Sequence, residues 1–294
     1  MKVLVSGGTG LVGRYVLDAL IAAGHEVIVG TRSSTAAGFP ILPLSLDPTR
    51  DQSEQFAGID TFIHLAFDHL PGRYRGGEGD DPARFRTRNR DGSVKLFEDA
   101  RAAGVKRCIF LSSRAVYDGL PAGSVLTEDM ALSPTSLYGR VKLDTEQALA
   151  ALSSGSFATT SLRATGVYGH HRPNKWDELL EDYLAGKPIA PRAGSEVHGD
   201  DLADAIRLVL EQDGAEVNGR RFNVSDIVTD RREILALFSA ACGLPQNHLP
   251  EGADHASVAV MDTGRLGALG WHPGGRKRLK HTLERLAQSR LPGR

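Results

Sequence analysis

The sequence predicts an α/β protein: a doubly wound parallel β-sheet with a smaller, partly interleaved C-terminal α/β lobe. Two observations predict this class. Short apolar runs alternate with amphipathic stretches of helical period through the first half of the chain, which is typical of a parallel sheet covered by helices on both faces. The turn between the first apolar run and the first helical stretch, VSGGTGLVG at residues 5–13, is also rich in glycine.

The N-terminal segment is a predicted βαβ unit. KVLVS (2–6) is a short apolar run that ends in glycines, which indicates a buried strand. LVGRYVLDALIAAGH (11–25) has apolar residues at helical spacing, and Gly24 supplies a stop signal. EVIVGTR (26–32) is a second predicted strand. The glycine-rich turn therefore follows the first strand of the sheet.

The same alternation continues and then loosens after about residue 166. Further strands are predicted at 60–67, 106–113 and 158–165, with helices at 83–104 and 135–152. Beyond them we expect helices at 200–212 and 230–244, a strand at 220–226, and a turn and a last basic helix within 267–288. We therefore predict a first domain over residues 1–165 and a smaller substrate-binding lobe over 166–294. One helix and one strand of the second part are expected to return to the first domain.

Composition excludes several classes of function. The 294 residues carry a net charge of −1, so no bulk attraction to nucleic acid or to a membrane surface is expected. The first apolar run is too short for a signal peptide, and no segment approaches the length of a membrane helix. Cys108 and Cys242 lie far apart and have no metal-ligand spacing. We expect a cytoplasmic protein without a metal site.

The glycine-rich turn predicts a dinucleotide site in the first domain. Ligands of doubly wound sheets bind where the strands end, and a glycine turn there lets backbone amides approach a pyrophosphate. Gly7 would permit the tight turn, Gly10 the close approach, and Gly13 the packing of helix on strand. Turn geometry alone is the alternative explanation. The other residues of this turn that we expect to contact the dinucleotide are Thr9, Leu11 and Val12.

The end of the second predicted strand bears on the type of cofactor. An NAD site usually places an acidic residue there to bind the ribose 2′-hydroxyl. In VIVGTRSS, Gly30 stands at that position and Arg32 follows. Because an arginine can pair with a 2′-phosphate, the sequence favours NADP, with NAD as the other possibility. Asp47 is a candidate contact to the adenine, or the start of a turn.

Tyr138 and Lys142 are the candidate acid/base pair. Their spacing puts both on one face of a predicted helix. A nearby ammonium stabilises a phenolate and lowers the pKa of a tyrosine toward the range useful for proton transfer. About 25 residues earlier, Ser112 and Ser113 end a predicted strand, where a hydroxyl could bond the substrate oxygen. Strand-end capping is the alternative role for these serines.

These stretches together resemble the extended short-chain dehydrogenase/reductases, in the NAD(P)-dependent epimerase/dehydratase branch. The matching motifs are GGTGLVG, HLA, NRDG, LSSRAVYD, SPTSLYGRVK, VHGDDLADAI, RRFNVSD and LGW, in family order and over nearly the whole chain. The resemblance implies a Rossmann-type dinucleotide-binding domain. It implies Ser113, four residues before Tyr117, as the catalytic hydroxyl and Tyr138 as the acid/base. The remaining residues that it assigns to the cofactor region are Leu65, Ala66, Asn89 and Lys142.

The expected activity is hydride transfer between the nicotinamide and a small carbonyl, alcohol or sugar, using a Ser-Tyr-Lys triad. The alternative is a nucleotide-sugar 4-epimerase with a tightly bound cofactor, and a third possibility is a non-catalytic NADP sensor. Nucleotide-sugar members commonly have Asn where this chain has Gly166, and an Arg from which Arg192 is displaced. These departures favour a smaller substrate. The candidate substrate contacts are Arg114, His170, Arg172 and Trp176. The resemblance also makes a homodimer possible.

Overall fold

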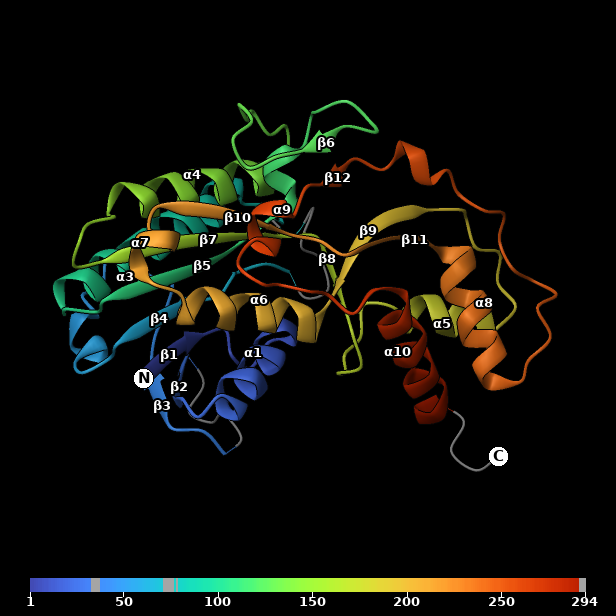
Figure 1. Ribbon diagram of the computed structural model, residues 1–294, viewed down its shortest axis with the longest axis horizontal. Helices are drawn as coiled ribbons and strands as arrows, with labels where there is room; N and C mark the ends of the chain where they lie inside the picture. Colours follow the sequence, from blue (N-terminus) through green and yellow to red (C-terminus); the bar gives the residue numbers. More distant parts are fainter. Residues whose placement is uncertain (33–37, 71–76, 78, 291–294) are drawn as a thin grey trace.

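The computed structural model describes residues 1–32, 38–70, 77 and 79–290 (Figure 1). Its main feature is a seven-stranded sheet in the order β10-β7-β5-β4-β1-β2-β3. Every neighbouring pair in this sheet is parallel. The order runs outward in both directions from β1 and β4, so the sheet is doubly wound and the predicted fold class is confirmed.

The strands of this sheet are β1 (Lys2–Ser6), β2 (Glu26–Thr31), β3 (Ile41–Pro43), β4 (Thr61–His64), β5 (Arg107–Ser113), β7 (Ala158–Ala164) and β10 (Arg220–Val224). Two smaller sheets are formed by β8 (Gly166–Tyr168), β9 (Ala193–His198) and β11 (Ile227–Asp230), and by β6 (Val125–Leu126) and β12 (Val260–Met261). The sequence periodicity predicted the six longest strands of the main sheet. It missed β9, which has six residues, and the strands β3, β6, β8, β11 and β12, which have two to four residues and are too brief to show a period.

The α-helices are α1 (Leu11–Ala22), α2 (Pro82–Arg86), α3 (Gly92–Ala102), α4 (Leu137–Ala151), α5 (Asp177–Leu184), α6 (Gly199–Glu211), α7 (Gly214–Val217), α8 (Arg231–Cys242), α9 (Gly264–Gly267) and α10 (Gly275–Arg290). Single turns of 3₁₀ or π-helix are η1 (Ser53–Phe56), η2 (Thr87–Asp91), η3 (Arg114–Tyr117) and η4 (His255–Ser257). None of the described helices is long and apolar enough to cross a bilayer.

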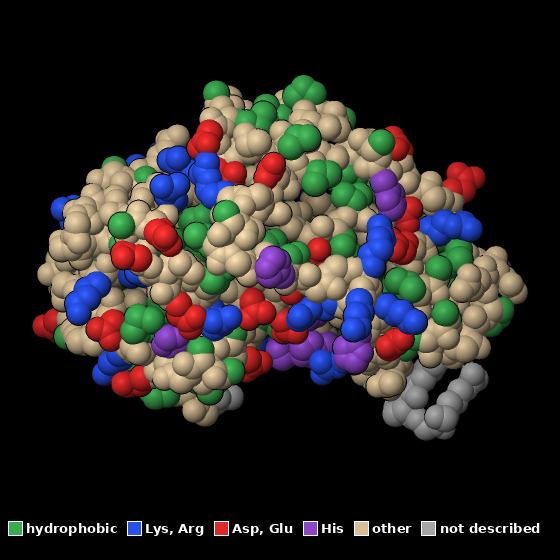
Figure 2. Space-filling model, viewed as in Figure 1, with side chains coloured by type: hydrophobic (Ala, Val, Ile, Leu, Met, Phe, Trp, Pro, Cys, Tyr) green, Lys and Arg blue, Asp and Glu red, His purple; other side chains and the backbone are tan. Residues whose placement is uncertain are grey.

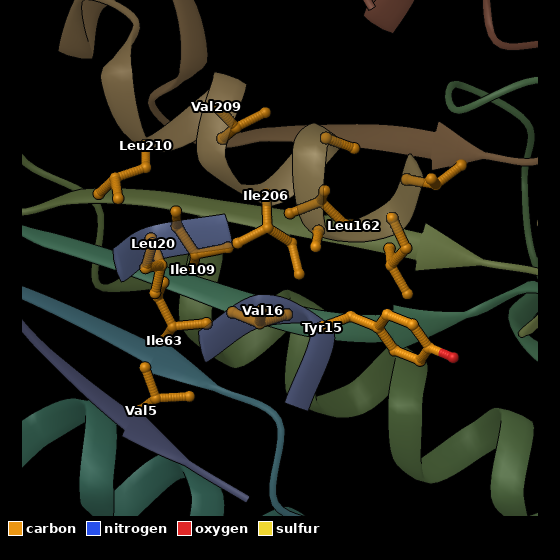
Figure 3. Close-up of a cluster of buried hydrophobic side chains, with 14 of the residues drawn as sticks. Val5, Tyr15, Val16, Leu20, Ile63, Ile109, Leu162, Ile206, Val209 and Leu210 are labelled. Carbon is orange, nitrogen blue, oxygen red and sulfur yellow. The ribbon is translucent and has the colours of Figure 1, made fainter. Parts of the chain in front are cut away.

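Two layers of helices bury the two faces of the main sheet. Alternate residues of β1 point to opposite faces, so Val3 and Val5 pack with α1 and α6 while Leu4 packs with α3 and α4. Figure 3 shows the first of these layers. The labelled side chains come from four strands and from α1 and α6: Val5, Ile63, Ile109, Leu162, Tyr15, Val16, Leu20, Ile206, Val209 and Leu210.

The C-terminal part of the chain contributes to both halves of the molecule. Helices α5, α8 and α10 lie together beside β9 and β11 (Figure 1) and enclose a separate hydrophobic cluster. Strand β10, in contrast, pairs with β7 at the edge of the main sheet, and α6 covers that sheet. This is the interleaving that the sequence pattern predicts. The domain boundary at residue 165 stays a prediction.

The predicted helix at 83–104 is interrupted. It consists of α2, one turn of π-helix (η2) and α3. Asn89 lies in the π-turn, is only 1% exposed, and bonds the backbone of Asp68. A π-turn shifts the register of a helix and often occurs at functional sites. Of the polar stretch before this helix, residues 71–76 and 78 lie outside the described residues.

We expect Gly13→Ala to destabilise the protein by about 1–3 kcal/mol, because overpacking a close backbone contact carries a cost of that order. A Cβ at Gly13 would overlap the carbonyl oxygens of Gly7 and Gly8 and lie 2.6 Å from the Gly8 carbonyl carbon. Urea unfolding measures the change. Gly155→Ala is the matched control, since a Cβ there meets nothing within 4 Å. Equal stability of the two variants would contradict the packing argument.

Candidate active site

A cavity of about 330 Å³ opens at the carboxyl ends of β1, β2, β4 and β5, on both sides of the point where strand order reverses. This is the place where doubly wound sheets bind ligands. The residues that line it are Ser6, Gly7, Thr9, Gly10, Leu11, Val12, Gly13, Gly30, Thr31, Arg32, Leu44, Ser45, Leu46, Leu65, Ala66, Phe67, Asp68, His69, Leu96, Leu111, Ser112, Tyr138 and Lys142. Most of the residues predicted to bind the cofactor are therefore brought together.

The glycine turn gives this cavity a wall of bare backbone. Gly7 has φ of +73°, which L side chains rarely adopt, and a Cβ there would lie 2.7 Å from the Ala66 nitrogen. Helix α1 begins at Leu11 with Gly10 as its N-cap, and no side chain caps it. The amides of its first turn and the positive end of its dipole are thus available to an anion. Helices α4, α6 and α8 are capped by Ser136, His198 and Asp230.

Tyr138 and Lys142 face the cavity from α4, one turn apart. The Lys142 ammonium donates a 2.8 Å hydrogen bond to the Leu111 carbonyl of β5 and lies 6.0 Å from the Tyr138 ring centroid. Lys142 is 4% exposed, and burial lowers its pKa to about 7. Glu146, one turn further along α4, opposes this shift and raises the pKa. Near neutral pH the charged and neutral forms of Lys142 are therefore close in free energy.

The two serines at the end of β5 lie in different environments. Ser112 lines the cavity, and its buried hydroxyl has no hydrogen-bond partner among the described residues. Ser113 is the N-cap of η3, and its Oγ accepts a 3.2 Å hydrogen bond from the Ala115 amide. A hydroxyl that accepts from the backbone keeps its own hydrogen for a substrate oxygen. Ser113 is not among the residues that line the cavity, and its catalytic role stays a prediction.

A chain of buried hydrogen bonds supports the loop after β4. The Ser6 hydroxyl lies 2.6 Å from His64 Nδ1, and His64 Nε2 lies 2.8 Å from the Ser93 hydroxyl, which donates to the Asn89 carbonyl. Since Ser93 donates onward, His64 donates through Nε2 and accepts at Nδ1. Burial lowers the His64 pKa to about 3, so the ring is neutral. Asn89 holds the loop itself, through both backbone groups of Asp68.

Phe67 is a residue of the site that the sequence analysis missed. Its ring packs edge-on against Tyr138, at a centroid distance of 5.2 Å, and the Lys142 ammonium lies 4.4 Å from its centroid. A cation over an aromatic face is stabilised, more so when it is desolvated. The signal available in the sequence was the large aromatic residue directly after HLA. Asp68, which was also missed, follows it in the cavity wall.

The residues considered for cofactor selection are split between the cavity wall and the surface. Arg32 lines the cavity and lies 3.8 Å from Asp68 Oδ1. Asp47 is outside the lining residues, and its carboxylate accepts hydrogen bonds from the Thr49 amide and hydroxyl. These bonds lower the Asp47 pKa. Asp47 was predicted either to contact the adenine or to begin a turn, and its hydrogen bonds to Thr49 are those of a turn.

The predicted substrate contacts are not brought together at the cavity. Trp176 is 4% exposed and stacks on Tyr168 within a hydrophobic cluster, so it is a packing residue here. Arg172 donates to Ser289 Oγ at the surface. Arg114 donates to the Ala259 carbonyl. His170 packs against Tyr15 of α1.

Histidine side chains gather between α1 and α10 (Figure 2). Among the described residues, His170, His198 and Asp200 place ligand-type atoms within 4.8 Å of one another. Two contacts disfavour a cation there. The Asp200 amide donates to His198 Nδ1, which puts the ring proton on Nε2, and Arg278 pairs with the Asp200 carboxylate at 2.9 Å. Burial lowers the His198 pKa to about 4, so the ring is neutral and carries a single proton, on Nε2.

The protein is an extended short-chain dehydrogenase/reductase. Three features together define this class: the topology of the sheet, the glycine turn after β1, and the Tyr138–Lys142 pair on α4. The chain belongs to the NAD dependent epimerase/dehydratase family, whose sequence profile matches residues 3–225. This confirms the resemblance carried by the motifs, and the chain is an enzyme of that family.

Relatives of this chain include sugar-nucleotide epimerases. It is 29% identical to a UDP-glucose 4-epimerase of Corynebacterium glutamicum over 93% of this chain and 91% of the relative. Among solved structures, UDP-glucose 4-epimerase of Thermotoga maritima with UDP-glucose has a TM-score of 0.78 at 23% identity, covering 99% of this chain and 100% of that one. UDP-glucuronic acid 4-epimerase of Bacillus cereus in complex with NAD has a TM-score of 0.80 at 20% identity, covering all of both chains. The family description and the latter complex name NAD, and neither supports the preference for NADP predicted from Gly30 and Arg32.

We expect Lys142→Met to stabilise the cofactor-free protein, and to do so more at about pH 6 than at about pH 9. The unfolded pKa of lysine is about 10.4, whereas burial lowers that of Lys142 to about 7. Below the folded pKa the buried ammonium destabilises the fold fully, and this cost declines as the pH rises toward the unfolded pKa. Thermal unfolding at both pH values measures the difference, with exposed Lys106→Met as the control. A stabilisation that does not depend on pH would contradict the assignment.

Proposed function

We propose that the protein is an NAD-dependent 4-epimerase acting on a nucleotide sugar. The observation that carries the proposal is the position of Tyr138 and Lys142 beside the end of β5 in a glycine-lined cavity. Similarity to UDP-glucose 4-epimerases over nearly the whole chain favours this activity over the simple dehydrogenase expected from the sequence. The retained Tyr138 and Lys142 argue against a non-catalytic sensor.

The residues present suit a dinucleotide. Gly7 and Gly10 let backbone approach closely, and the uncapped first turn of α1 offers amides and a partial positive charge to a pyrophosphate. A side chain at Gly7 would collide with the Ala66 backbone and close this space. NAD supplies a nicotinamide that accepts hydride from the sugar carbon and returns it.

Tyr138 is proposed to move the proton. Its phenolate removes the proton from the sugar hydroxyl as that carbon is oxidised, and the resulting phenol returns the proton when the ketone is reduced again. The Lys142 ammonium, 6.0 Å from the ring centroid of Tyr138, favours the phenolate electrostatically. The Ser113 hydroxyl is proposed to donate to the same substrate oxygen, which orients and polarises it. With NAD bound, return of the hydride to the opposite face of the ketone would invert the configuration at that carbon.

One observation favours a second candidate, a dehydrogenase of a smaller sugar or carbonyl compound. A Cβ at Gly166 would lie 2.6 Å from both Glu196 Oε2 and Lys175 Nζ. An ion pair of Lys175 and Glu196 therefore occupies the place where nucleotide-sugar members commonly carry an asparagine. An ion pair in place of a neutral amide side chain offers different hydrogen-bonding groups to a substrate, so a different part of the substrate would be bound at this position.

The net fate of the hydride separates the two candidates. An epimerase interconverts UDP-glucose and UDP-galactose with no net formation of NADH, because the hydride is returned to the same sugar. A dehydrogenase forms NADH in proportion to product. Proton NMR of the sugars combined with NADH absorbance distinguishes them. Net NADH formation from a free sugar, without epimerisation of any nucleotide sugar, would overturn the proposal.

We expect Tyr138→Phe to lower kcat by about 10²–10⁴-fold, the usual contribution of a general acid/base, while NAD binding changes little. Calorimetric titration with NAD and turnover of the nucleotide sugar measure the two effects. Tyr183→Phe is the control, since Tyr183 belongs to the hydrophobic cluster around α5 and α8. Full turnover in Tyr138→Phe would disprove the assignment.

A further inference from the structure

The strand that usually supplies the ribose-binding acid cannot do so in this chain. Gly30 lies near the end of β2 and lines the cavity. A Cβ at Gly30 would overlap Leu44 Cδ1 and lie 3.1 Å from Leu44 Cγ. Leu44 is only 5% exposed and belongs to the hydrophobic cluster around Phe62, so a side chain at Gly30 would displace Leu44 from the hydrophobic core. A carboxylate for the ribose hydroxyls has to come from another element.

Asp68 presents a carboxylate on the wall of the same cavity, across from this strand end. Its two oxygens face two arginines: Arg32 Nη1 lies 3.8 Å from Oδ1, and Arg88 Nε lies 3.7 Å from Oδ2. Both separations exceed hydrogen-bond length. In the described part of the chain the carboxylate therefore has charge partners and no hydrogen-bond donor, which leaves its lone pairs available to hydroxyl groups of a ligand.

The position of Asp68 is fixed by its backbone. The Asp68 amide donates to Asn89 Oδ1 at 2.6 Å, and the Asp68 carbonyl accepts from Asn89 Nδ2 at 2.7 Å. Asn89 is 1% exposed and lies in the π-turn that interrupts the predicted helix. A carboxylate on such a support binds a ligand with little loss of backbone freedom.

We propose that Asp68 is the acid that binds the adenosine ribose hydroxyls of NAD, and that it selects against NADP. A vicinal diol can donate to the carboxylate, whereas a 2′-phosphate would bring negative charge against it. Arg32 is the residue that could attract the phosphate, and among the described residues it forms an ion pair with the Asp68 carboxylate itself. The inference rests on the dinucleotide cofactor of the proposed function and is independent of its sugar substrate.

The test compares NAD and NADP binding to cofactor-free protein by calorimetric titration. We expect the wild type to bind NAD more tightly than NADP. Asp68→Asn should weaken NAD and strengthen NADP, so that the ratio of the two dissociation constants shifts toward NADP by at least about tenfold, as loss of a charged hydrogen-bond acceptor implies. Asp51→Asn removes the same charge from an exposed turn outside the cavity lining and should leave the ratio unchanged.

Arg32→Ala provides a second variant that does not alter the Asn89-bound loop. It should increase the preference for NAD, because the 2′-phosphate then loses the Arg32 guanidinium that could attract it, while the Asp68 carboxylate still repels it. An unchanged ratio in folded Asp68→Asn, or a wild type that prefers NADP and loses that preference in Arg32→Ala, would overturn the inference while leaving the epimerase proposal intact. If the wild type binds neither dinucleotide, both proposals fail.

Discussion

The candidate site depends on how closely α1 and the loop after β4 approach the end of β1. Gly13 brings α1 against the carbonyls of Gly7 and Gly8, and Gly7 in turn lies against the Ala66 backbone. Three elements can share this space only because two of the contact points carry no side chain. The result is a groove walled by backbone, into which the uncapped end of α1 opens. The same glycines are thus needed for the packing of α1 and for the groove in which a cofactor is proposed to bind.

The helix that carries Tyr138 and Lys142 is held by a buried ion pair. Arg163 of β7 bonds Glu146 of α4 at 2.8 Å, with side chains 2% and 0% exposed. Removing one partner of a buried pair typically destabilises a protein by about 3–5 kcal/mol, because the other charge is left uncompensated. If α4 packed on β7 in another register, Glu146 and Arg163 would be separated and both charges would be buried without a partner. The ion pair therefore fixes how α4 packs on the sheet. Arg163 also donates to the hydroxyl of Tyr117, which ties the segment after Ser113 to this network.

Apolar periodicity and glycine spacing in the sequence were enough to predict the longer strands and the glycine turn. Contacts between side chains that are distant in the sequence could not be predicted in this way. Apolar period found the longer strands, and glycine spacing found the turn, because close backbone approach requires glycine at particular positions. Nothing in the helical pattern around Asn89 distinguishes a π-turn from a regular helix. The proximity of Arg32 and Asp68 is a product of topology, since β2 and the β4 loop meet only after β1 has paired with both. Trp176 suggested a substrate contact because the sequence does not reveal that Tyr168 stacks on it.

The two halves of the site therefore differ in how they are encoded. The cofactor half is defined by backbone, and its residues follow from a motif. On the proposed substrate side, the half-buried Glu196 carboxylate of β9 lies next to Gly166 of β8 and pairs with Lys175, which precedes α5. Burial raises the pKa of Glu196, and the Lys175 ammonium opposes that rise. A substrate group that enters here meets a paired ammonium and carboxylate in place of a neutral amide. Family membership thus accounts for the glycine turn and the Tyr138–Lys142 pair, whereas the Lys175–Glu196 ion pair is a feature of this chain that the family motif does not predict.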